Sequence, residues 1–308
     1  MAVGFISHSD CGRHDTGWDH PEHVGRLRAI TRALRDEPEL MMSLHHHEGR
    51  HATVDELALA HDRAYIARVE ALAAAGGGRL DGDTVVSDGS WDAATAGAGC
   101  LLDAVDFAMD GTAARSFCAV RPPGHHALRD AGMGFCLFGN VAIAAHYARA
   151  RHGLVRVLIV DWDVHHGNGT QALVEHDPAI RFVSMHQWPW YPGSGAADDR
   201  GPHHSVWNVP MAAGLPAAAY VEALEGAVLA ATTGWAPDLV LVSAGFDSML
   251  GDPLGGFTLG ADDYVRLTRT LVALAERSAN GRLVSALEGG YAPPAVGAAA
   301  VAHLKALA

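Results

Sequence analysis

The chain has 308 residues, of which 49% are hydrophobic, so it is long enough and apolar enough to bury a large core. Its formal net charge of −13 argues against a nucleic-acid-binding surface and favours a cationic or neutral substrate. The first apolar stretch is too short for a signal peptide or a membrane span, which predicts a cytoplasmic protein with no membrane partner.

Short apolar runs alternate with segments of helical period along the sequence. Strands are predicted at 2–6, 116–120, 155–160, 180–185, 238–243 and 282–287, and helices at 91–110, 140–151, 217–233, 261–278 and 295–308. Ser90 and Gly111 are expected to be the N-cap and the C-terminal stop of the first of these helices. Nearly unbroken apolar strands predict an α/β fold, a parallel sheet flanked by helices on both faces. No linker or repeat is visible, so residues 1–308 are predicted to form a single domain.

The cysteines have no CxxC spacing, and all but the first lie in apolar runs. They are therefore predicted to be buried free thiols rather than disulfides or structural zinc ligands. The four are Cys11, Cys100, Cys118 and Cys136.

Four separate strands end in polar or glycine-rich sequence: VRPPGHHA, VDWDVHHGNG, VSAGFDSMLGDP and ALEGGY. Sites of open α/β sheets lie beyond the carboxyl ends of the strands, so these four ends are expected to meet in one cleft. Each segment by itself could equally be an ordinary loop.

In the run VRVLIVDWDVHHGNGTQ, side chains two positions apart share a face of an extended chain. Asp161, Asp163 and His165 therefore point to one side. Carboxylates buried so close together need a positive partner, and an Asp/His set suits an open zinc site. A buried ion-pair cluster is the alternative for this segment. Asp247 can supply the third protein ligand beside Asp163 and His165, which leaves positions for water and a substrate oxygen.

His125 and His126 follow a Pro-Pro-Gly turn and are interpreted as a proton-transfer pair, with metal ligands or simple loop histidines as alternatives. Asp161 and Asn168 are available to fix their tautomers. Tyr291 follows two glycines at a strand end, where its phenol could stabilise charge developing on a carbonyl oxygen.

Aromatic residues without charges occur at Phe135 and in the segment 188–195. They could line a narrow channel for an alkyl chain, or be ordinary core or lid packing. The histidines at 45–47 and His51 lie outside the strand-end pattern and are interpreted as exposed, with adventitious metal binding as the alternative. His303, in the last predicted helix, is interpreted as structural.

The segments RPPGHHA, GFCLFGNVAIAA, DWDVHHGNGTQ, FVSMH, WYPGSG, SAGFDSMLGDPLGGF and LEGGY, in this order, resemble the histone deacetylase superfamily. The opening HDTGWDHPE is similar to that of class II and bacterial members. The resemblance covers about Ser7 to Tyr291. It implies the arginase–deacetylase fold and hydrolysis of an N-acyl amide, typically acetyl-lysine, to acetate and a free amine.

On matching positions, the resemblance implies that Asp163, His165 and Asp247 bind Zn²⁺, with Fe²⁺ as an alternative. It also implies a structural potassium ion, held by the Asp161 side chain, Ser184 and backbone oxygens of Asp163, His165 and Met185.

The resemblance further implies roles in catalysis. His126 paired with Asn168 would be the general base and then the general acid. His125 paired with Asp161 would be an electrostatic partner, and Tyr291 would polarise the carbonyl.

Substrate-binding residues follow from the same resemblance. Phe135 and Tyr191 match aromatics that line an acyl-lysine tunnel. Leu254 matches a residue of its wall, and Asp83 matches a carboxylate at its rim. The remaining predicted substrate-binding residues are Gly134 and Gly289.

Two departures from the family pattern concern loop shape: Val24 replaces a common proline, and Gly139 stands where Asn or Asp is usual.

The nearest alternative activity is that of an acetylpolyamine amidohydrolase, which acts on small acetylated amines. No obvious entrance-narrowing insertion lies between Ala75 and Trp91, which favours lysine side chains. A two-manganese ureohydrolase would need more carboxylate ligands, and a non-catalytic acyl-lysine-binding protein could lack Tyr291 or a histidine of the pair. A homo-oligomer is left open.

Overall fold

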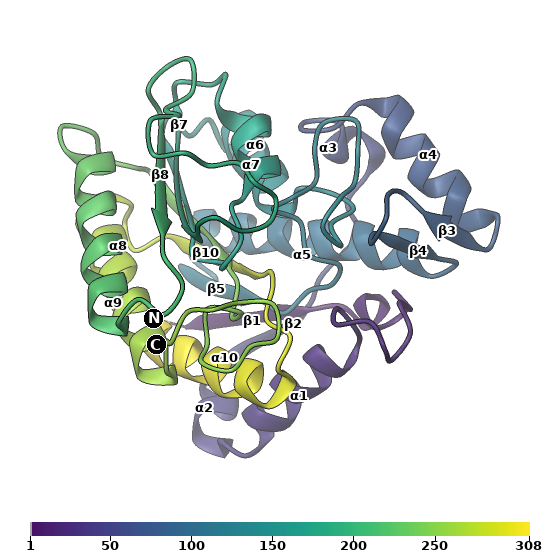
Figure 1. Cartoon of the computed structure of the whole chain (residues 1–308), viewed down its shortest axis with the longest axis horizontal. Coiled ribbons are helices and arrows are strands. Elements are labelled where there is room, and N and C mark those ends of the chain that lie inside the picture. The colour runs from purple at the N-terminus through teal and green to yellow at the C-terminus, as the bar shows by residue number, and fades with distance from the viewer. Residues whose placement is uncertain (1) are drawn as a thin grey trace.

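A computed structural model describes residues 2–308. Its centre is an eight-stranded sheet in which every pair of neighbours is parallel, in the order β2-β1-β5-β10-β9-β6-β7-β8 (Figure 1). The strands are β1 (Val3–Ser7), β2 (Leu44–Glu48), β5 (Arg115–Cys118), β6 (Val157–Asp161), β7 (Ile180–Gln187), β8 (Val206–Met211), β9 (Leu239–Ala244) and β10 (Leu283–Leu287). A separate antiparallel hairpin consists of β3 (Gly77–Arg79) and β4 (Val85–Ser87).

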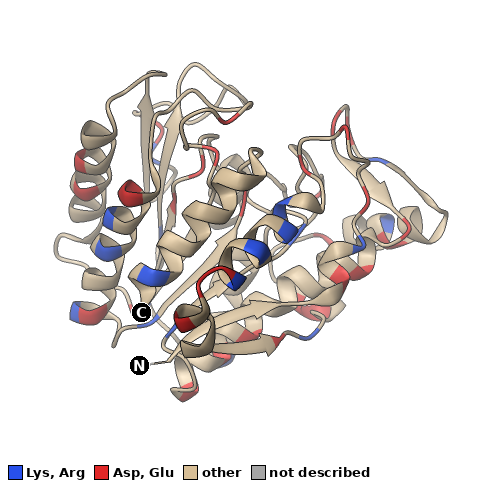
Figure 2. Ribbon diagram, turned by 90° about the horizontal axis from the view of Figure 1, so that it is seen from below, with Lys and Arg blue, Asp and Glu red and all other residues tan. Residues whose placement is uncertain are grey.

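Helices cover both faces of the sheet, as predicted (Figure 2). One layer contains α1 (Gly25–Arg35), α8 (Ala217–Thr232), α9 (Ala261–Ser278) and α10 (Pro293–Leu307). The other contains α5 (Ser90–Asp110), α6 (Asn140–His152) and α7 (Asn168–Val174), with α3 (Val54–Leu57) and α4 (Arg63–Ala74) packed outside them. The short helices α2 (Pro38–Ser43) and η1 (Ser9–Gly12) complete the chain. Lys and Arg are interspersed with Asp and Glu over the face seen in Figure 2.

The two-sided cover explains why the strands are apolar without alternation. In β6, Leu158 and Val160 pack in the core beneath α8, α9 and α10, whereas Val157 and Ile159 pack in the core beneath α5 and α6. All four side chains are fully buried. Successive side chains of a strand point to opposite faces, so a strand buried on both faces needs apolar residues at every position.

The predicted helices agree with the structure to within one residue at most ends, but their caps do not all agree. The prediction that Ser90 is an N-cap is wrong: Gly89 occupies that position, and the Ser90 hydroxyl contacts His14 Nδ1 and accepts from the Ser87 N–H instead. Gly111 does end the helix, with φ of 87°. Val24 and Gly139 stand at the N-caps of α1 and α6 without a side-chain cap.

The cysteine prediction is confirmed, since all four thiols are free and buried. His303 is also structural: its ring is fully buried and contacts the hydroxyls of Thr268 and Ser285, each at 2.7 Å. Among residues 2–308, no helix has both the length and the hydropathy needed to cross a bilayer.

His303 gives a prediction about acid stability. Burial lowers its pKa to about 3, whereas an unfolded chain titrates near 6.5. Below pH 6.5 this histidine therefore binds a proton in the unfolded state but not in the folded state. The free energy of unfolding falls as the pH drops from 6.5 toward 3, by at most about 1.4 kcal/mol per pH unit for each such group. In urea titrations between pH 8 and 4, we expect His303→Gln to lose stability less steeply than the wild type. His203→Gln, at an exposed position, should keep the wild-type slope, and equal slopes for all three proteins would contradict this account.

Candidate active site

Four strand ends form the site, and their strands are neighbours at the centre of the sheet. The order β5-β10-β9-β6 brings together the segments that follow each strand, as the sequence pattern predicts. Beyond β5 lies the His125–His126 pair, beyond β6 the Asp163–His165 segment, beyond β9 Asp247 and beyond β10 Tyr291.

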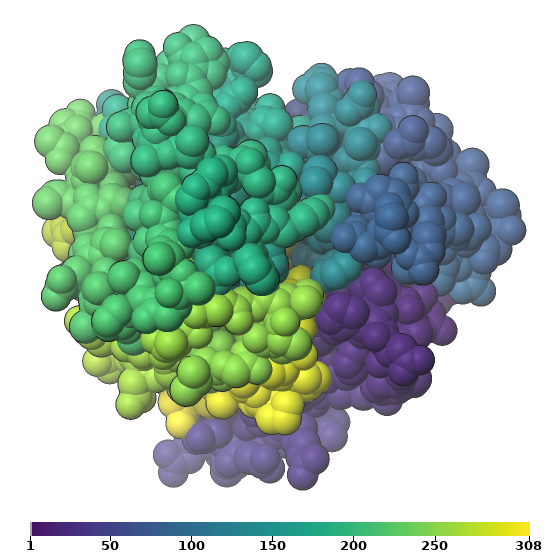
Figure 3. All heavy atoms as spheres, viewed as in Figure 1, coloured from purple at the N-terminus to yellow at the C-terminus, as the bar shows by residue number. Residues whose placement is uncertain are grey.

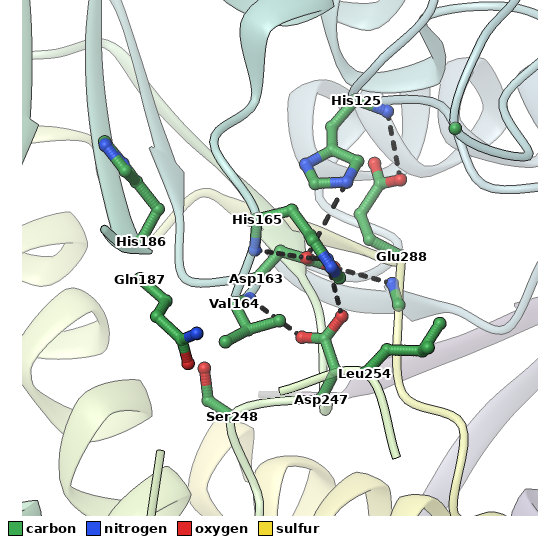
Figure 4. A network of polar contacts seen from close by, with 12 residues as sticks. His125, Asp163, Val164, His165, His186, Gln187, Asp247, Ser248, Leu254 and Glu288 are labelled. Atoms are coloured by element: carbon green, nitrogen blue, oxygen red, sulfur yellow. Dashed lines mark hydrogen bonds and ion pairs between the residues drawn. The ribbon is translucent and has the colours of Figure 1, made fainter. Parts of the chain in front are cut away.

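Asp163, His165 and Asp247 meet at one point (Figure 4). His165 Nδ1 lies 3.0 Å from Asp163 Oδ1 and 3.3 Å from Asp247 Oδ2. The candidate ligand atoms of the three residues all lie within 4.8 Å of one another, and all three side chains are buried. Residues 84 positions apart in sequence, by the difference of 247 and 163, therefore share one small volume.

This cluster fits a divalent cation. Asp247 Oδ1 accepts a hydrogen bond from the Val164 N–H at 2.8 Å, but the buried Asp247 Oδ2 has no hydrogen-bond partner. Asp163 Oδ2 accepts from the Gly289 N–H at 2.8 Å, and a Cβ on Gly289 would lie only 2.1 Å from Asp247 Oδ2. The carboxylates are thus oriented by backbone donors, and one lone oxygen faces the common point, as metal coordination requires.

The pKa shifts of the cluster residues also favour a bound cation. Burial and the nearby Asp163 raise the pKa of Asp247 to about 7. Burial lowers the pKa of His165, but Asp163 and Asp247 outweigh it and raise that pKa to about 9. The two buried carboxylates thus need positive charge beside them, and a bound cation would supply it in place of the proton on His165.

The histidine pair lies beside this cluster, with ring centroids 4.0 Å apart. His125 Nδ1 lies 2.9 Å from Asp161 Oδ2, and His126 Nδ1 lies 2.7 Å from Asn168 Oδ1. Both partners are acceptors, so each ring carries a proton on Nδ1, and its Nε2 is the nitrogen left to face the site. The predicted pairings with Asp161 and Asn168 are therefore present as contacts.

The two histidines differ in charge. Burial lowers the pKa of His125, but Asp163 and Asp161 outweigh it and hold that pKa well above 6.5. Burial together with His125 and His165 holds the pKa of His126 well below 6.5. One ring is consequently cationic and the other neutral near pH 7, which separates an electrostatic role from a base.

Backbone groups of the pair are fixed by Glu288 and Cys136, which the sequence analysis did not assign to the site. Glu288 Oε2 accepts from the Gly124 N–H at 2.6 Å and from the His125 N–H at 3.1 Å. Cys136 Sγ accepts from the His126 N–H at 3.4 Å. Glu288 is fully buried, and burial raises its pKa to about 7. The LEGGY and GFCLFGN motifs thus also hold the histidine loop.

Tyr291 sits at the edge of the cluster, with its phenol ring 5.8 Å from that of Phe135. Its backbone N–H donates to Asp252 Oδ2 at 2.6 Å, and Asp252 Oδ1 accepts from the Leu254 N–H at 2.9 Å. Burial and Asp163 raise the pKa of the Tyr291 phenol well above 10, so the hydroxyl keeps its proton. Asp252 therefore ties the tyrosine loop to the Leu254 loop.

A buried ion network supports both catalytic loops, and the sequence analysis missed it. Glu22 accepts hydrogen bonds from Arg26 and Arg121, and all three side chains are fully buried. Arg26 also donates to the carbonyls of Glu288 and Gly290, directly before Tyr291. The only sequence signal was Glu22 and Arg26 at helical spacing, which is equally typical of a surface pair.

A cavity of about 200 Å³ leads to the cluster. Its lining residues are Asp83, His126, Gly134, Phe135, His165, Trp190, Tyr191, Leu254 and Tyr291. In Figure 3 a recess lies where the purple N-terminal, blue, teal and lime parts of the chain meet. Five of the six predicted substrate-binding residues line the cavity. Gly289 does not, because its N–H instead faces Asp163. Trp190 also lines the cavity, and it belongs to the aromatic segment 188–195 for which the sequence left a channel or ordinary packing open.

The predicted potassium ligands come from neighbouring strands. Asp161, at the end of β6, is in register with Ser184 of β7, and Met185 follows. Asp161 Oδ1 accepts from the Asp163 N–H at 3.0 Å. The structure thus brings these groups side by side, which is compatible with the predicted set.

Fold and site together define a class: α/β enzymes whose carboxylates and histidines gather beyond the carboxyl ends of a parallel sheet. The model of the histone deacetylase domain family matches residues 20–307. The chain therefore belongs to the histone deacetylase family, and it has that family's arginase–deacetylase fold.

Comparisons with individual relatives support this family membership. The chain is 46% identical to the uncharacterized protein slr0245 of Synechocystis sp., over 99% of both chains. It is 40% identical to a histone deacetylase-like amidohydrolase of Pseudomonas aeruginosa, over 89% of this chain and 72% of the relative. Among solved structures, the HDA15 HD domain superposes with a TM-score of 0.94 at 34% identity, covering 99% of this chain and 88% of that one. These similarities support a hydrolytic deacetylase.

Proposed function

We propose that the chain is a metal-dependent deacetylase that hydrolyses the acetyl amide of lysine side chains, with Zn²⁺ as the ion and Fe²⁺ as the alternative. The observation that carries the proposal is the buried Asp163–His165–Asp247 cluster at the base of a narrow cavity, beside one cationic and one neutral histidine. The strands of the sheet come from the whole length of the chain, which supports one catalytic domain over 1–308.

A divalent cation held by Asp163, His165 and Asp247 would supply Lewis acidity to the amide carbonyl and to the attacking water. His126 accepts the proton of that water at Nε2, because Asn168 engages Nδ1 and the low pKa keeps the ring neutral. The same nitrogen then gives the proton to the departing amine.

Two further groups stabilise the charge that develops on the carbonyl oxygen. Tyr291 donates a hydrogen bond from its hydroxyl, which stays protonated because its pKa is raised. His125, held cationic by Asp161 and Asp163, adds positive charge next to the base. A potassium ion near Asp161 and Ser184 would be structural.

The alkyl chain of the substrate fits between Phe135 and Tyr191, which line the cavity. Asp83, which also lines the cavity, would hold the substrate backbone. The segment between Ala75 and Trp91 folds into the short hairpin β3–β4, which supports an entrance wide enough for a peptide.

A metal reconstitution experiment tests this function. Chelated protein should release no acetate from acetyl-lysine peptides, and added Zn²⁺ or Fe²⁺ should restore turnover, whereas Mg²⁺ should not. Parallel assays with acetylputrescine and acetylspermidine decide the substrate class, and a strong preference for these amines would replace the proposal by a polyamine deacetylase. Binding of acetyl-lysine by the metal-loaded protein without acetate release would refute an enzymatic role.

A further inference from the structure

A second group of metal-ligating side chains lies outside the active site, where β1 and β2 end. His8 and Asp10 flank the start of η1, and His51 follows β2 by three residues. Their candidate ligand atoms lie within 4.8 Å of one another. None of the three lines the cavity that leads to Tyr291. His8 lines a separate open groove of about 670 Å³ between α1 and the strands β1 and β2, so solvent reaches the cluster.

The spacing of these atoms is that of a tetrahedral metal site. Bonds of about 2.0–2.1 Å to a tetrahedral ion place ligand atoms roughly 3.3 Å apart. Asp10 Oδ2 lies 3.1 Å from His51 Nε2 and 3.7 Å from His8 Nδ1. The ring centroids of His8 and His51 are 4.7 Å apart. The Asp10 carboxylate is thus already placed between two imidazoles.

The tautomer of His51 leaves a lone pair facing that carboxylate. Its Nδ1 lies 2.8 Å from the Thr95 hydroxyl oxygen. Thr95 donates its own proton to the backbone carbonyls of Trp91 and Asp92, at 2.9 and 3.1 Å, so the hydroxyl accepts from His51 Nδ1–H. In the neutral ring Nε2 is then an acceptor. An acceptor nitrogen 3.1 Å from a carboxylate oxygen is repulsive unless a second ring proton or a metal ion lies between them, and a metal ion can satisfy His8 Nδ1 as well.

The contacts around the cluster determine which ligand atoms are available and which metal ions they favour. His8 Nδ1 accepts from the Asp10 N–H at 3.0 Å, and an ion would take over this nitrogen. Arg13 approaches the other oxygen, Asp10 Oδ1, at 3.5 Å and leaves Oδ2 free. Two imidazoles and one carboxylate favour zinc and similar transition ions over Mg²⁺ or Ca²⁺.

We infer that His8, Asp10 and His51 form a second, surface-accessible binding site for a divalent transition metal of the zinc type. The site is independent of the proposed function. An ion there links η1, the end of β2 and, through Thr95, helix α5. It thereby fixes the start of the segment 9–25, which carries His20 to within 4.7 Å of the Phe135 ring at the cavity.

Metal stoichiometry tests the inference. Chelated protein is dialysed against micromolar free Zn²⁺ at pH 7.5, and its zinc content is measured by mass spectrometry. We expect two ions per chain in the wild type and one in His51→Ala, a twofold loss. His46→Ala, in β2 five residues before His51 and outside the cluster, is the matched control and should retain both ions.

A cobalt titration adds a readout that is independent of catalysis. The visible absorption of tetrahedral Co²⁺ should saturate with two equivalents in the wild type and with one in Asp10→Asn. Equal metal contents of wild type and His51→Ala would overturn the inference, as would equal losses in His51→Ala and His46→Ala, which indicate adventitious binding only. If the catalytic cluster binds no metal, the wild type holds one ion and His51→Ala none, so failure of the proposed function stays distinguishable.

Discussion

Tyr291→Phe is expected to lower kcat by about a hundredfold or more while leaving KM and the melting temperature close to wild type. Loss of one preorganised donor to a developing oxyanion costs about that much in other enzymes. In residues 2–308 no hydrogen bond to the Tyr291 hydroxyl is present, so folding does not depend on it. The phenyl ring keeps its packing on Phe135 and its place 5.1 Å from the Arg26 guanidinium.

Steady-state kinetics on acetyl-lysine peptides and thermal unfolding measure the two parts of this prediction. Tyr65→Phe is the matched control, because its hydroxyl donates to the Leu137 carbonyl at 2.6 Å. That variant should lose stability and keep kcat, the opposite pattern. A kcat for Tyr291→Phe within threefold of wild type would remove the hydroxyl from the mechanism.

Much of the fold was predictable because the strands are buried on both faces. The run VLIV (157–160) of β6 has no polar position, so it identifies a central strand without any knowledge of its neighbours. The edge strands that the sequence analysis missed have weaker patterns. β2 (LHHHE) is an edge strand with exposed histidines, and β8 (VWNVPM) is the opposite edge and contains a proline. Edge strands bury fewer side chains, so their sequences show a weaker apolar pattern.

The site residues also differ in how far the sequence alone could predict them. Asp163, His165 and Asp247 were predictable because charged side chains at the end of an apolar strand need a shared partner. Glu288 and Glu22 were not, because their roles depend on which backbone groups and guanidiniums surround them in space. Only the structure shows that Glu288 accepts from the histidine loop and that Glu22 joins two arginines from distant segments.

Glu22→Gln is expected to cost about 3–5 kcal/mol of unfolding free energy, because it leaves two buried guanidiniums without a counter-ion. Burial by itself raises the pKa of Glu22, but Arg121 and Arg26 outweigh burial and hold that pKa far below its usual 4.5. The carboxylate is therefore charged throughout the working pH range. Urea unfolding at pH 7.5 measures the loss. Glu37→Gln, which breaks an exposed 2.7 Å pair with Lys305, should change stability by no more than about 1 kcal/mol.

Glu22→Gln should also lower kcat. Arg26 donates to the carbonyls of Glu288 and Gly290, and Arg121 lies four residues before His125 in the chain. Stability and positioning can be separated with a triple variant, Glu22→Met with Arg26→Met and Arg121→Met. Apolar replacement of a buried ion network often restores stability. We expect the triple variant to be more stable than Glu22→Gln and still slow, since no guanidinium then holds the carbonyls of Glu288 and Gly290 directly before Tyr291. Recovery of kcat together with stability would show that the network serves folding alone, and a loss below 1 kcal/mol in Glu22→Gln would contradict the burial of its charge.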